Sequence, residues 1–230
     1  MMRLAGFVVL CCVVSISSGQ EKCCIEPDMF TLTSGALVGW HVDQYFGTVG
    51  QTIFMVFDYT QPRFHFNVTS VAAANTTNVL VIDDYKQNVE WTIDPVAQKC
   101  QKAPLPEGKE MPKKCIPGNA QYIDQVNNPG DVLVNRWLYE LKSPMENGQV
   151  SAAVTVDGCL PTGGSFVGTT NTSGQDVDVM EGIGYYNFEE LNDVSKYFKL
   201  PSYCDSKFSE PMKTKSIKAA QKYIKRRGFL

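Results

Sequence analysis

Apolar and polar residues alternate along much of this chain with a period of two, the spacing at which successive side chains of a β-strand point to opposite faces. Residues 51–59 carry apolar residues on both faces, which predicts a strand that is buried on both sides. Residues 63–68 alternate cleanly, with apolar residues on one face and polar residues on the other. If Asn67 is glycosylated, the polar face that it shares with Arg63 and His65 is in contact with water.

Further hairpins are predicted where two such segments are separated by residues that favour turns. The paired segments are 79–82 with 89–93, through a turn near Asp83 and Asp84, and 132–141 with 150–156, around Asn147 and Gly148. Residues 166–167 and 177–179 predict later strands. The glycine-containing segments 163–164 and 182–184 are expected in turns.

Two regions lack this alternation. Residues 95–118 contain five prolines and five lysines and predict a long loop, which Cys100 and Cys115 would clamp. Residues 187–200 predict a short helix, because a capping-box pattern precedes an apolar stripe and Pro201 then stops the helix.

The composition agrees with a mainly-β protein. Valine, threonine, tyrosine and phenylalanine are abundant, and 43% of the residues are hydrophobic, which favours an all-β or β-rich fold. About 211 residues remain after the N-terminal segment discussed next, enough for one domain with its own core.

The first nineteen residues have the features of a secretory signal peptide. Arg3 supplies the positive end, residues 4–14 form the apolar stretch, and small residues precede a cleavage site after Gly19. A short anchor helix is the alternative, but crossing a membrane takes about twenty apolar residues. The predicted divisions of the chain are a signal peptide at 1–19, a globular domain at 20–206 and a basic tail at 207–230.

Charge is distributed unevenly between the domain and the tail. The domain has twelve basic and twenty-three acidic residues, whereas the tail has eight basic residues and one acid. Residues 213–227 could form a basic amphipathic helix, although a solvated end is the simpler interpretation. No motif indicates a nucleic-acid partner.

Six cysteines remain after cleavage, and an even number in an oxidising compartment predicts disulfides. They are Cys23, Cys24, Cys100, Cys115, Cys159 and Cys204. Sequons at Asn67, Asn75 and Asn171 predict N-linked glycans. We therefore expect a secreted, extracellular glycoprotein, with a lysosomal lumen as the less favoured location.

Catalytic and metal-binding signatures are scarce, so we expect a protein that is not an enzyme. The two histidines, His41 and His65, have no nucleophile signature beside them. Residues 176–182 begin like a calcium loop but place Met180 at a ligand position, so an alternating strand fits them better. Calcium is the one cofactor left open, with its site unknown.

Aromatic residues on the predicted strand faces are candidates for lining a ligand pocket, although a closed β core would use the same residues. The candidates are Phe57, Phe64, Phe66, Trp91, Trp137 and Tyr139.

The order of several short motifs resembles the ependymin family. Residues 57–63 place an acidic–aromatic pair before an arginine, residues 159–161 read Cys-Leu-Pro after a predicted strand, and residues 198–204 close the domain. The resemblance runs from Cys23 to Cys204, and the basic tail does not align.

This resemblance implies a fold of curved antiparallel sheets stacked as an open half-barrel or sandwich, like bacterial lipoprotein carriers, with short helices and often a homodimer. It implies a secreted, disulfide-bonded N-glycoprotein that binds a lipid or other hydrophobic ligand in an apolar pocket, with weak calcium binding. The alternative is an extracellular-matrix, cell-adhesion or shell-matrix glycoprotein that binds calcium.

The resemblance also implies a disulfide pairing. The early cysteine would bridge to Cys159, and Cys100 would bridge to Cys204. Cys115 would then take whichever of Cys23 and Cys24 remains.

Overall fold

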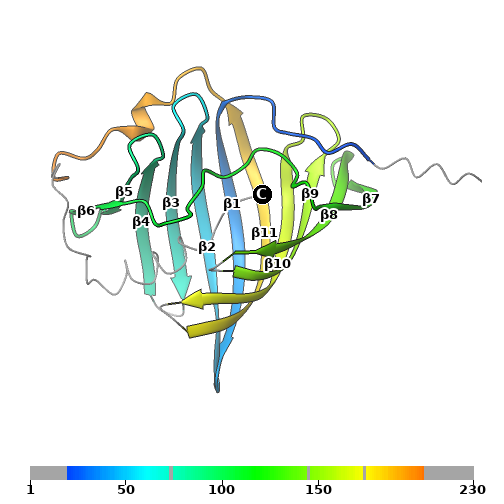
Figure 1. Ribbon diagram of the computed structural model, residues 1–230, viewed down its shortest axis with the longest axis horizontal. Coiled ribbons are helices and arrows are strands. Elements are labelled where there is room, and N and C mark those ends of the chain that lie inside the picture. The colour runs from blue at the N-terminus through cyan, green and yellow to red at the C-terminus, as the bar shows by residue number, and fades with distance from the viewer. Residues whose placement is uncertain (1–19, 73–74, 144–145, 173–174, 205–230) are drawn as a thin grey trace, which may run out of the picture.

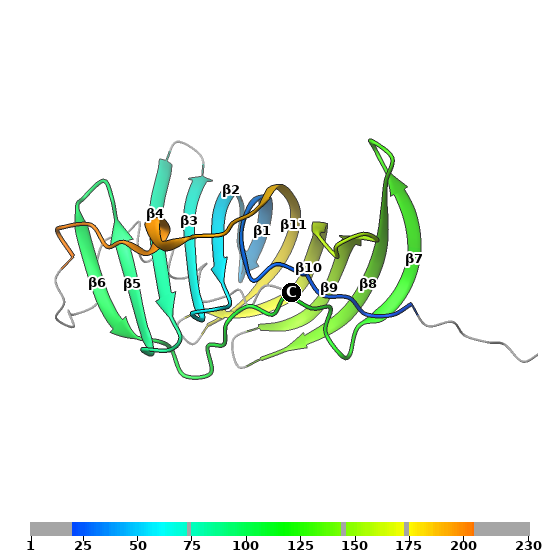
Figure 2. The ribbon, with the colours of Figure 1, turned by 90° about the horizontal axis from the view of Figure 1, so that it is seen from above.

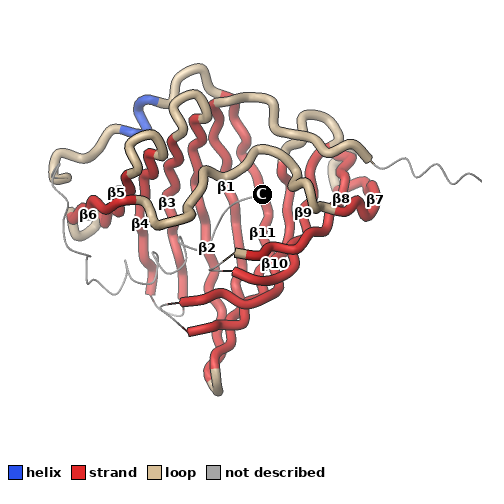
Figure 3. The backbone as a smooth tube through the Cα atoms, in the orientation of Figure 1, coloured by secondary structure: helices blue, strands red, loops and turns tan. Residues whose placement is uncertain are grey.

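The computed structural model describes residues 20–204, apart from 73–74, 144–145 and 173–174. Strands make up most of this part of the chain, with one short helical segment beside them (Figure 3). The elements are β1 Met29–Val42, β2 Tyr45–Asp58, β3 Arg63–Ala72, β4 Asn75–Asp84, β5 Val89–Asp94, β6 Lys99–Pro104, β7 Gln121–Asn128, β8 Val132–Lys142, β9 Glu146–Thr155, β10 Pro161–Thr172, β11 Gln175–Glu190 and the 3-10 helix η1 Ser195–Phe198. The predicted mainly-β fold is confirmed. The predicted signal peptide and basic tail lie outside the described residues.

The strands form one antiparallel sheet in the order β6-β5-β4-β3-β2-β1-β11-β10-β9-β8-β7. Neighbours in the sheet are also neighbours in the sequence, except where β1 pairs with β11. The sheet therefore consists of two meanders, β1–β6 and β7–β11, joined side by side by this one long-range pairing. Because β6 and β7 stand at opposite edges, the sheet is an open half-barrel and not a closed barrel.

The sheet bends into a trough, and the connection from β6 to β7 crosses its open side (Figures 1 and 2). We call this connection, residues 105–120, the strap. The N-terminal segment, residues 20–28, runs beside it: the Ile25 amide donates to the Lys114 carbonyl at 2.7 Å, and the Ile116 amide donates to the Cys23 carbonyl at 3.0 Å. The face of the sheet toward the strap is called the inner face, and the opposite face the outer face.

The segment after β11, residues 191–204, covers part of the outer face. Phe198 and Cys204 pack against the apolar cluster that Ile82, Trp91 and their neighbours form on β4 and β5. Val56 and Phe57, which face opposite sides of β2, are both buried, so the prediction for residues 51–59 is confirmed at the end of the strand, whereas Thr52 is exposed. Because His65 is covered by the same segment and is 8% exposed, the expected contact of its face with water is wrong at that residue.

The two regions without alternation differ from their predictions. Part of the predicted loop is β6, a polar edge strand that pairs with β5 along its whole length. The predicted helix at 187–200 is wrong, because β11 continues to Glu190 and only Ser195–Phe198 form a short 3-10 helix. Pairing of Glu190 with Phe30 on β1 overrides the local helical pattern.

The glycines expected in turns lie inside strands. Gly148 is in β9, and the preceding turn is closed by the Ser143 amide, which donates to the Glu146 carbonyl at 2.8 Å. Gly163 and Gly184 face each other across β10 and β11, and Gly184 also faces Gly35 on β1. Glycine is used in these strands because neighbouring backbones approach closely or need to bend.

Candidate functional site

The inner face of the first meander carries a row of buried phenylalanines. The ring centroid of Phe57 lies 4.6 Å from that of Phe30 and 4.7 Å from that of Phe64. The Phe64 centroid lies 4.9 Å from that of Phe66. Alternation along β2 and β3 puts these rings on one face, so three of the predicted pocket residues do come together.

The second meander presents Trp137 and Tyr139 on the same side of the sheet. Both are buried, and both belong to a cluster that includes Ile116 and Ala120 of the strap. Burial raises the pKa of Tyr139 to about 12, so its hydroxyl remains protonated at neutral pH. The strap therefore packs against apolar residues of the second meander.

Trp91 is the predicted pocket residue that lies elsewhere. Its side chain is on the outer face, in the cluster with Ile82 and Ile93 that Phe198 covers. The Lys102 ammonium lies 5.5 Å from the centroid of the Trp91 ring. Nothing in the sequence indicates how β5 is aligned with β4, and this alignment decides which face each of its residues occupies.

The space beneath the strap is almost filled in this conformation. A cavity of about 10 Å³ is lined by residues that include Phe30, Met55, Phe57, Lys113 and Tyr185. This volume is about that of a single water-sized probe. The predicted pocket residues therefore form a packed core here, and a larger ligand requires the strap to move.

Lys109 of the strap lies over the phenylalanine row and binds two buried carboxylates. Its Nζ is 2.7 Å from Asp83 Oδ2 and 2.9 Å from Glu90 Oε2, and it lies 5.8 Å from the centroid of the Phe66 ring. Asp83 and Glu90 are paired across β4 and β5, with Asp83 fully buried. The Tyr85 hydroxyl also donates to Asp83 Oδ2, at 3.4 Å.

Burial and charge act in opposite directions at this cluster. Burial raises the pKa of Asp83 to about 6; Lys109 opposes this rise, and the Glu90 carboxylate adds to it. Burial alone would lower the pKa of Lys109, but Asp83 and Glu90 raise it above its ordinary value. A lysine facing two carboxylates leaves one negative charge without a matching cation, so repulsion from Glu90 adds to the larger effect of burial on the pKa of Asp83.

Lys109 and Glu90 are not recognisable as a pair from the sequence. The pattern around Asp83 predicts a turn, where aspartate is common, but the turn role belongs to Asp84, whose Oδ1 accepts from the Gln87 amide at 2.8 Å. Lys109 is one of five lysines in a proline-rich region. No local pattern shows which of them reaches a carboxylate on a distant hairpin.

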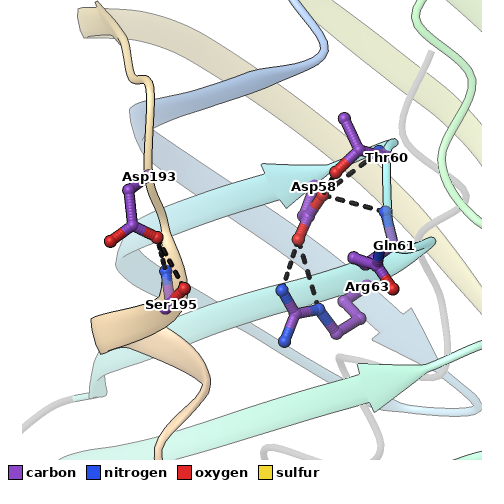
Figure 4. A network of polar contacts seen from close by, with 6 residues as sticks. All are labelled: Asp58, Thr60, Gln61, Arg63, Asp193 and Ser195. Carbon is purple, nitrogen blue, oxygen red and sulfur yellow. Dashed lines mark hydrogen bonds and ion pairs between the residues drawn. The ribbon is translucent and has the colours of Figure 1, made fainter.

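Two of the three motifs that carry the family resemblance, residues 57–63 and 198–204, meet at Arg63. Figure 4 shows how Asp58 holds Thr60, Gln61 and Arg63 in the first of them. Asp58 Oδ1 accepts from the Thr60 amide at 3.1 Å and the Gln61 amide at 3.0 Å, which fixes the β2–β3 turn. Its Oδ2 accepts from Arg63 Nη2 at 2.5 Å, and the Arg63 guanidinium lies 4.2 Å from the centroid of the Phe198 ring. The closing segment is thus attached to the turn through Arg63.

The pKa of Asp58 follows from these contacts. Burial would raise it, but the hydrogen bonds from Thr60, Arg63 and Gln61, together with the charge of Arg63, bring the pKa below its ordinary value. Asp58 therefore stays ionised at neutral pH and holds the turn. This role is structural.

The histidines occupy two different environments. His65 is buried, with Nδ1 2.6 Å from the Tyr197 carbonyl. Burial lowers the pKa of His65, partly offset by this hydrogen bond, so the ring is neutral at pH 7. His41 is exposed, with Nδ1 3.5 Å from Asp178 Oδ2.

Three disulfides join distant parts of the chain. They are Cys23–Cys159, Cys24–Cys115 and Cys100–Cys204, and their two cysteines lie 136, 91 and 104 residues apart in the sequence, respectively. This is the pairing that the family resemblance implied, and it assigns Cys23 and Cys24 to separate partners. Cys24–Cys115 links the strap to the N-terminal segment, and Cys100–Cys204 holds residues 191–204 to β6.

The sequons lie on strands. Asn67 is partly exposed on the outer face of β3, Asn75 begins β4, and Asn171 donates from Nδ2 to Asp176 Oδ1 at 2.8 Å. Glycosylation at these three positions stays a prediction. Asp178 is exposed between the buried Val177 and Val179, which confirms the alternating strand predicted there.

Within the described ranges, no group of three or more histidine, cysteine, aspartate or glutamate side chains is arranged to hold a metal ion. Calcium binding stays a prediction from the family resemblance, as do matrix partners and a homodimer. Among the same residues, no helix has the length and apolar character needed to span a membrane.

Comparison with solved structures gives distant similarities. An uncharacterized conserved protein from Thermus thermophilus matches with a TM-score of 0.44 and 8% identity, over 74% of this chain and 86% of that chain. A putative outer membrane lipoprotein-sorting protein domain from Vibrio parahaemolyticus matches with a TM-score of 0.33 and 5% identity, over 73% of this chain and 89% of that chain.

Comparison of sequences gives a family. Ependymin from Notemigonus crysoleucas is 24% identical over 203 residues, which cover 86% of each chain. Ependymin-related protein 1 from Haliotis asinina is 26% identical over 132 residues, which cover 55% of this chain and 64% of that protein. The sequence model of the family named Ependymin matches residues 73–204, more than half of the chain. The chain therefore belongs to the ependymin family.

Proposed function

We propose that this chain is a secreted carrier that binds a lipid or another hydrophobic molecule in the trough, between the inner face of the sheet and the strap. The observation that carries this proposal is the apolar inner face shared by both meanders and covered by a strap without regular secondary structure. A core that only stabilises a fold is usually covered by a second sheet or by helices.

The strap is attached in a way that allows it to move as a unit. Its backbone contacts with residues 20–28 pair it with another irregular segment and not with the sheet. Its polar contacts with the strands and their turns include the Lys109 ion pairs and three hydrogen bonds. The Tyr59 hydroxyl donates to the Pro112 carbonyl at 2.8 Å, the Leu105 amide to the Asn88 carbonyl at 3.2 Å, and Asn119 Nδ2 to the Glu140 carbonyl at 2.8 Å. Segments held by few contacts open at a lower free-energy cost than paired strands.

Buried polar atoms on the strap-facing side favour an amphiphilic ligand. Ser34 Oγ, Asp83 Oδ1 and Trp137 Nε1 are buried without a hydrogen-bond partner among the described residues. An unpaired buried polar group costs about 1–3 kcal/mol. A ligand with a polar head and an apolar chain would satisfy some of these atoms while its chain contacts the phenylalanines.

Secretion is part of the same proposal. Three disulfides that join distant segments form and persist in oxidising compartments. The signal-peptide pattern at 1–19 and the three sequons indicate the same route.

Brominated fatty acid is a suitable probe, because bromine quenches tryptophan emission only at short range. Two single-tryptophan proteins are compared: Trp40→Phe with Trp91→Phe leaves Trp137 on the strap-facing side, and Trp40→Phe with Trp137→Phe leaves Trp91 on the outer face. We expect saturable quenching of Trp137 and none of Trp91. Native mass spectrometry of the protein purified from its natural source is expected to show a bound amphiphile.

Quenching of Trp91 alone would place the ligand outside the trough and contradict the proposal. The absence of both quenching and a copurifying amphiphile would also contradict it. Because the mass measurement uses the unmodified protein, failure of a variant to fold does not leave the proposal untested.

A further inference from the structure

The β1–β2 hairpin ends in an exposed pair of aromatic residues. It projects beyond the ends of the neighbouring strands (Figure 1). On its β3 side, β2 is paired only from Gly50 onward, so residues 45–49 pair with β1 alone. At the tip, Tyr45 is 62% exposed and Phe46 is 81% exposed. Aromatic residues at the end of a projecting hairpin contribute little to the core and are positioned to contact another surface.

The two aromatic side chains point to opposite faces of the hairpin, because they are consecutive residues of a strand. A flat protein surface could cover one of them but not both. A lipid headgroup layer surrounds an inserted tip on all sides and covers both rings. The backbone of Tyr45 is paired with Val42, whereas the groups of residues 45–49 on the β3 side are open, so the tip suits the hydrated headgroup layer and not the hydrocarbon core.

A third aromatic residue stiffens the hairpin behind the tip. The Trp40 ring lies over Gly47, where an added Cβ would be 2.6 Å from Trp40 Cζ2. Trp40 thus supports the strand that carries Tyr45 and Phe46. Tyrosine and tryptophan are the residues most enriched where proteins meet the lipid–water interface.

The charges near the tip select the type of lipid. No lysine or arginine occurs between Lys22 and Arg63, so the hairpin carries no basic residue. Asp43 and Gln44 form its turn, and Asp178 lies near His41. Anionic lipids would be repelled by these carboxylates, whereas a zwitterionic surface accepts the aromatic rings.

We propose that the β1–β2 tip is a lipid-contact site, which inserts Tyr45 and Phe46 into the headgroup region of a zwitterionic membrane or lipid particle. Insertion is shallow, because the Asp43 carboxylate at the turn stays at the level of the headgroups. The site goes beyond the carrier function, since it brings the protein to a lipid surface whether or not the trough holds a ligand.

Flotation with vesicles of pure phosphatidylcholine tests this site. The full chain is expected to float with the vesicles. Phe46→Ser is expected to weaken partitioning about tenfold, and the double variant with Tyr45→Ser further. Val96→Ser is the matched control: Val96 is 84% exposed in the β5–β6 turn, and its loss should leave partitioning unchanged.

The inference is overturned if the wild-type protein does not bind these vesicles, or if Phe46→Ser binds them as wild type does. Loss of a dimer in Phe46→Ser, measured by light scattering without lipid, would reassign the tip to a protein contact. Quenching by soluble brominated fatty acid is measured in parallel. Vesicle binding with neither fatty-acid quenching nor a copurifying amphiphile would refute the carrier function alone, and the reverse would refute the lipid-contact site alone.

Discussion

At the scale of single residues, Asp83 is the group whose surroundings most affect its chemistry. It is fully buried, and its carboxylate faces Lys109, Glu90 and Tyr85. Its pKa rises from an ordinary value of 3.8 to about 6, chiefly because burial disfavours the charged form. The folded protein therefore binds a proton at Asp83 more tightly than the unfolded chain does.

This difference predicts a pH dependence of stability. The stabilisation from protonated Asp83 is fully present below pH 3.8 and is lost as the pH rises through 6. Asp83→Asn removes the ionisation, so its free energy of unfolding should improve relative to wild type by about 3 kcal/mol between pH 4 and 7, at about 1.4 kcal/mol for each pKa unit. Urea denaturation at a series of pH values measures the difference.

Asp157→Asn is the control for this comparison, since Asp157 is exposed in the β9–β10 turn. It should follow wild type within about 0.5 kcal/mol across the range. A constant difference between Asp83→Asn and wild type would show that the raised pKa of Asp83 is wrong.

The sequence predicted the burial of a side chain correctly where that burial depends only on the alternation within its own strand. Phe57, Phe64 and Phe66 share a buried face because alternation within β2 and β3 places them there. It failed for His65 and Trp91, whose surroundings depend on residues 191–204 covering the outer face. That contact forms between segments about a hundred residues or more apart and leaves no local pattern.

At the scale of the strands, glycine can be needed because a neighbouring backbone lies too close for a side chain. Gly168 and Gly182 test this reason, because only the first is crowded. An added Cβ at Gly168 would lie 2.3 Å from the Asn147 carbonyl oxygen and 2.6 Å from Gly148 Cα. An added Cβ at Gly182 meets nothing within 4 Å. Both glycines lie within strands, so the surroundings and not the type of element distinguish them.

Gly168→Ala is expected to lower the free energy of unfolding by about 1–3 kcal/mol, because β9 and β10 must separate to admit the methyl group. Gly182→Ala should be neutral or stabilise by about 0.5 kcal/mol, because alanine has less freedom in the unfolded chain. Thermal and urea denaturation of both variants measure the effects. Equal effects at the two positions would contradict the close packing of β9 against β10.

Hairpins were predictable at this scale, and so was the turn after Asp84, but the turn between β8 and β9 was not. The alternation found β4 with β5 and β8 with β9, since buried faces impose a period of two. Asn147 and Gly148 favour a turn by residue type, but they lie in β9, where glycine is required by the approach of Gly168. A local turn preference of this kind is weaker than the packing of neighbouring strands.

At the scale of the whole molecule, the sequence predicted a mainly-β domain, and the family resemblance implied an open curved sheet. Neither indicated the pairing of β1 with β11 or the strap across the trough. Long-range pairing depends on which faces are buried together, and the strap has no periodicity that could reveal its path. The disulfides are the long-range contacts that could be predicted, because the family resemblance implied their pairing.

The disulfides offer a test of whether the strap covers the ligand site. Cys24–Cys115 and Cys100–Cys204 close loops of similar length, 91 and 104 residues, so removing either should cost a similar 4–5 kcal/mol, roughly, if loop entropy dominates. The first bridge holds the strap to residues 20–28, and the second holds residues 191–204 on the outer face. Because the two losses of stability are similar, a difference in ligand kinetics between the two variants would come from which segment has been released.

We expect the double variant Cys24→Ser with Cys115→Ser to bind and release brominated fatty acid at least about tenfold faster than wild type, because the strap opens without its covalent partner. The double variant Cys100→Ser with Cys204→Ser should keep wild-type rates, since the outer face is not on the path to the trough. Stopped-flow quenching of Trp137 measures both rates, and amide exchange shows whether residues 105–120 or 191–204 have been released. Equal acceleration in both variants would mean that general loosening admits the ligand. Unchanged rates in the first variant, with the strap released, would show that the ligand enters by another route.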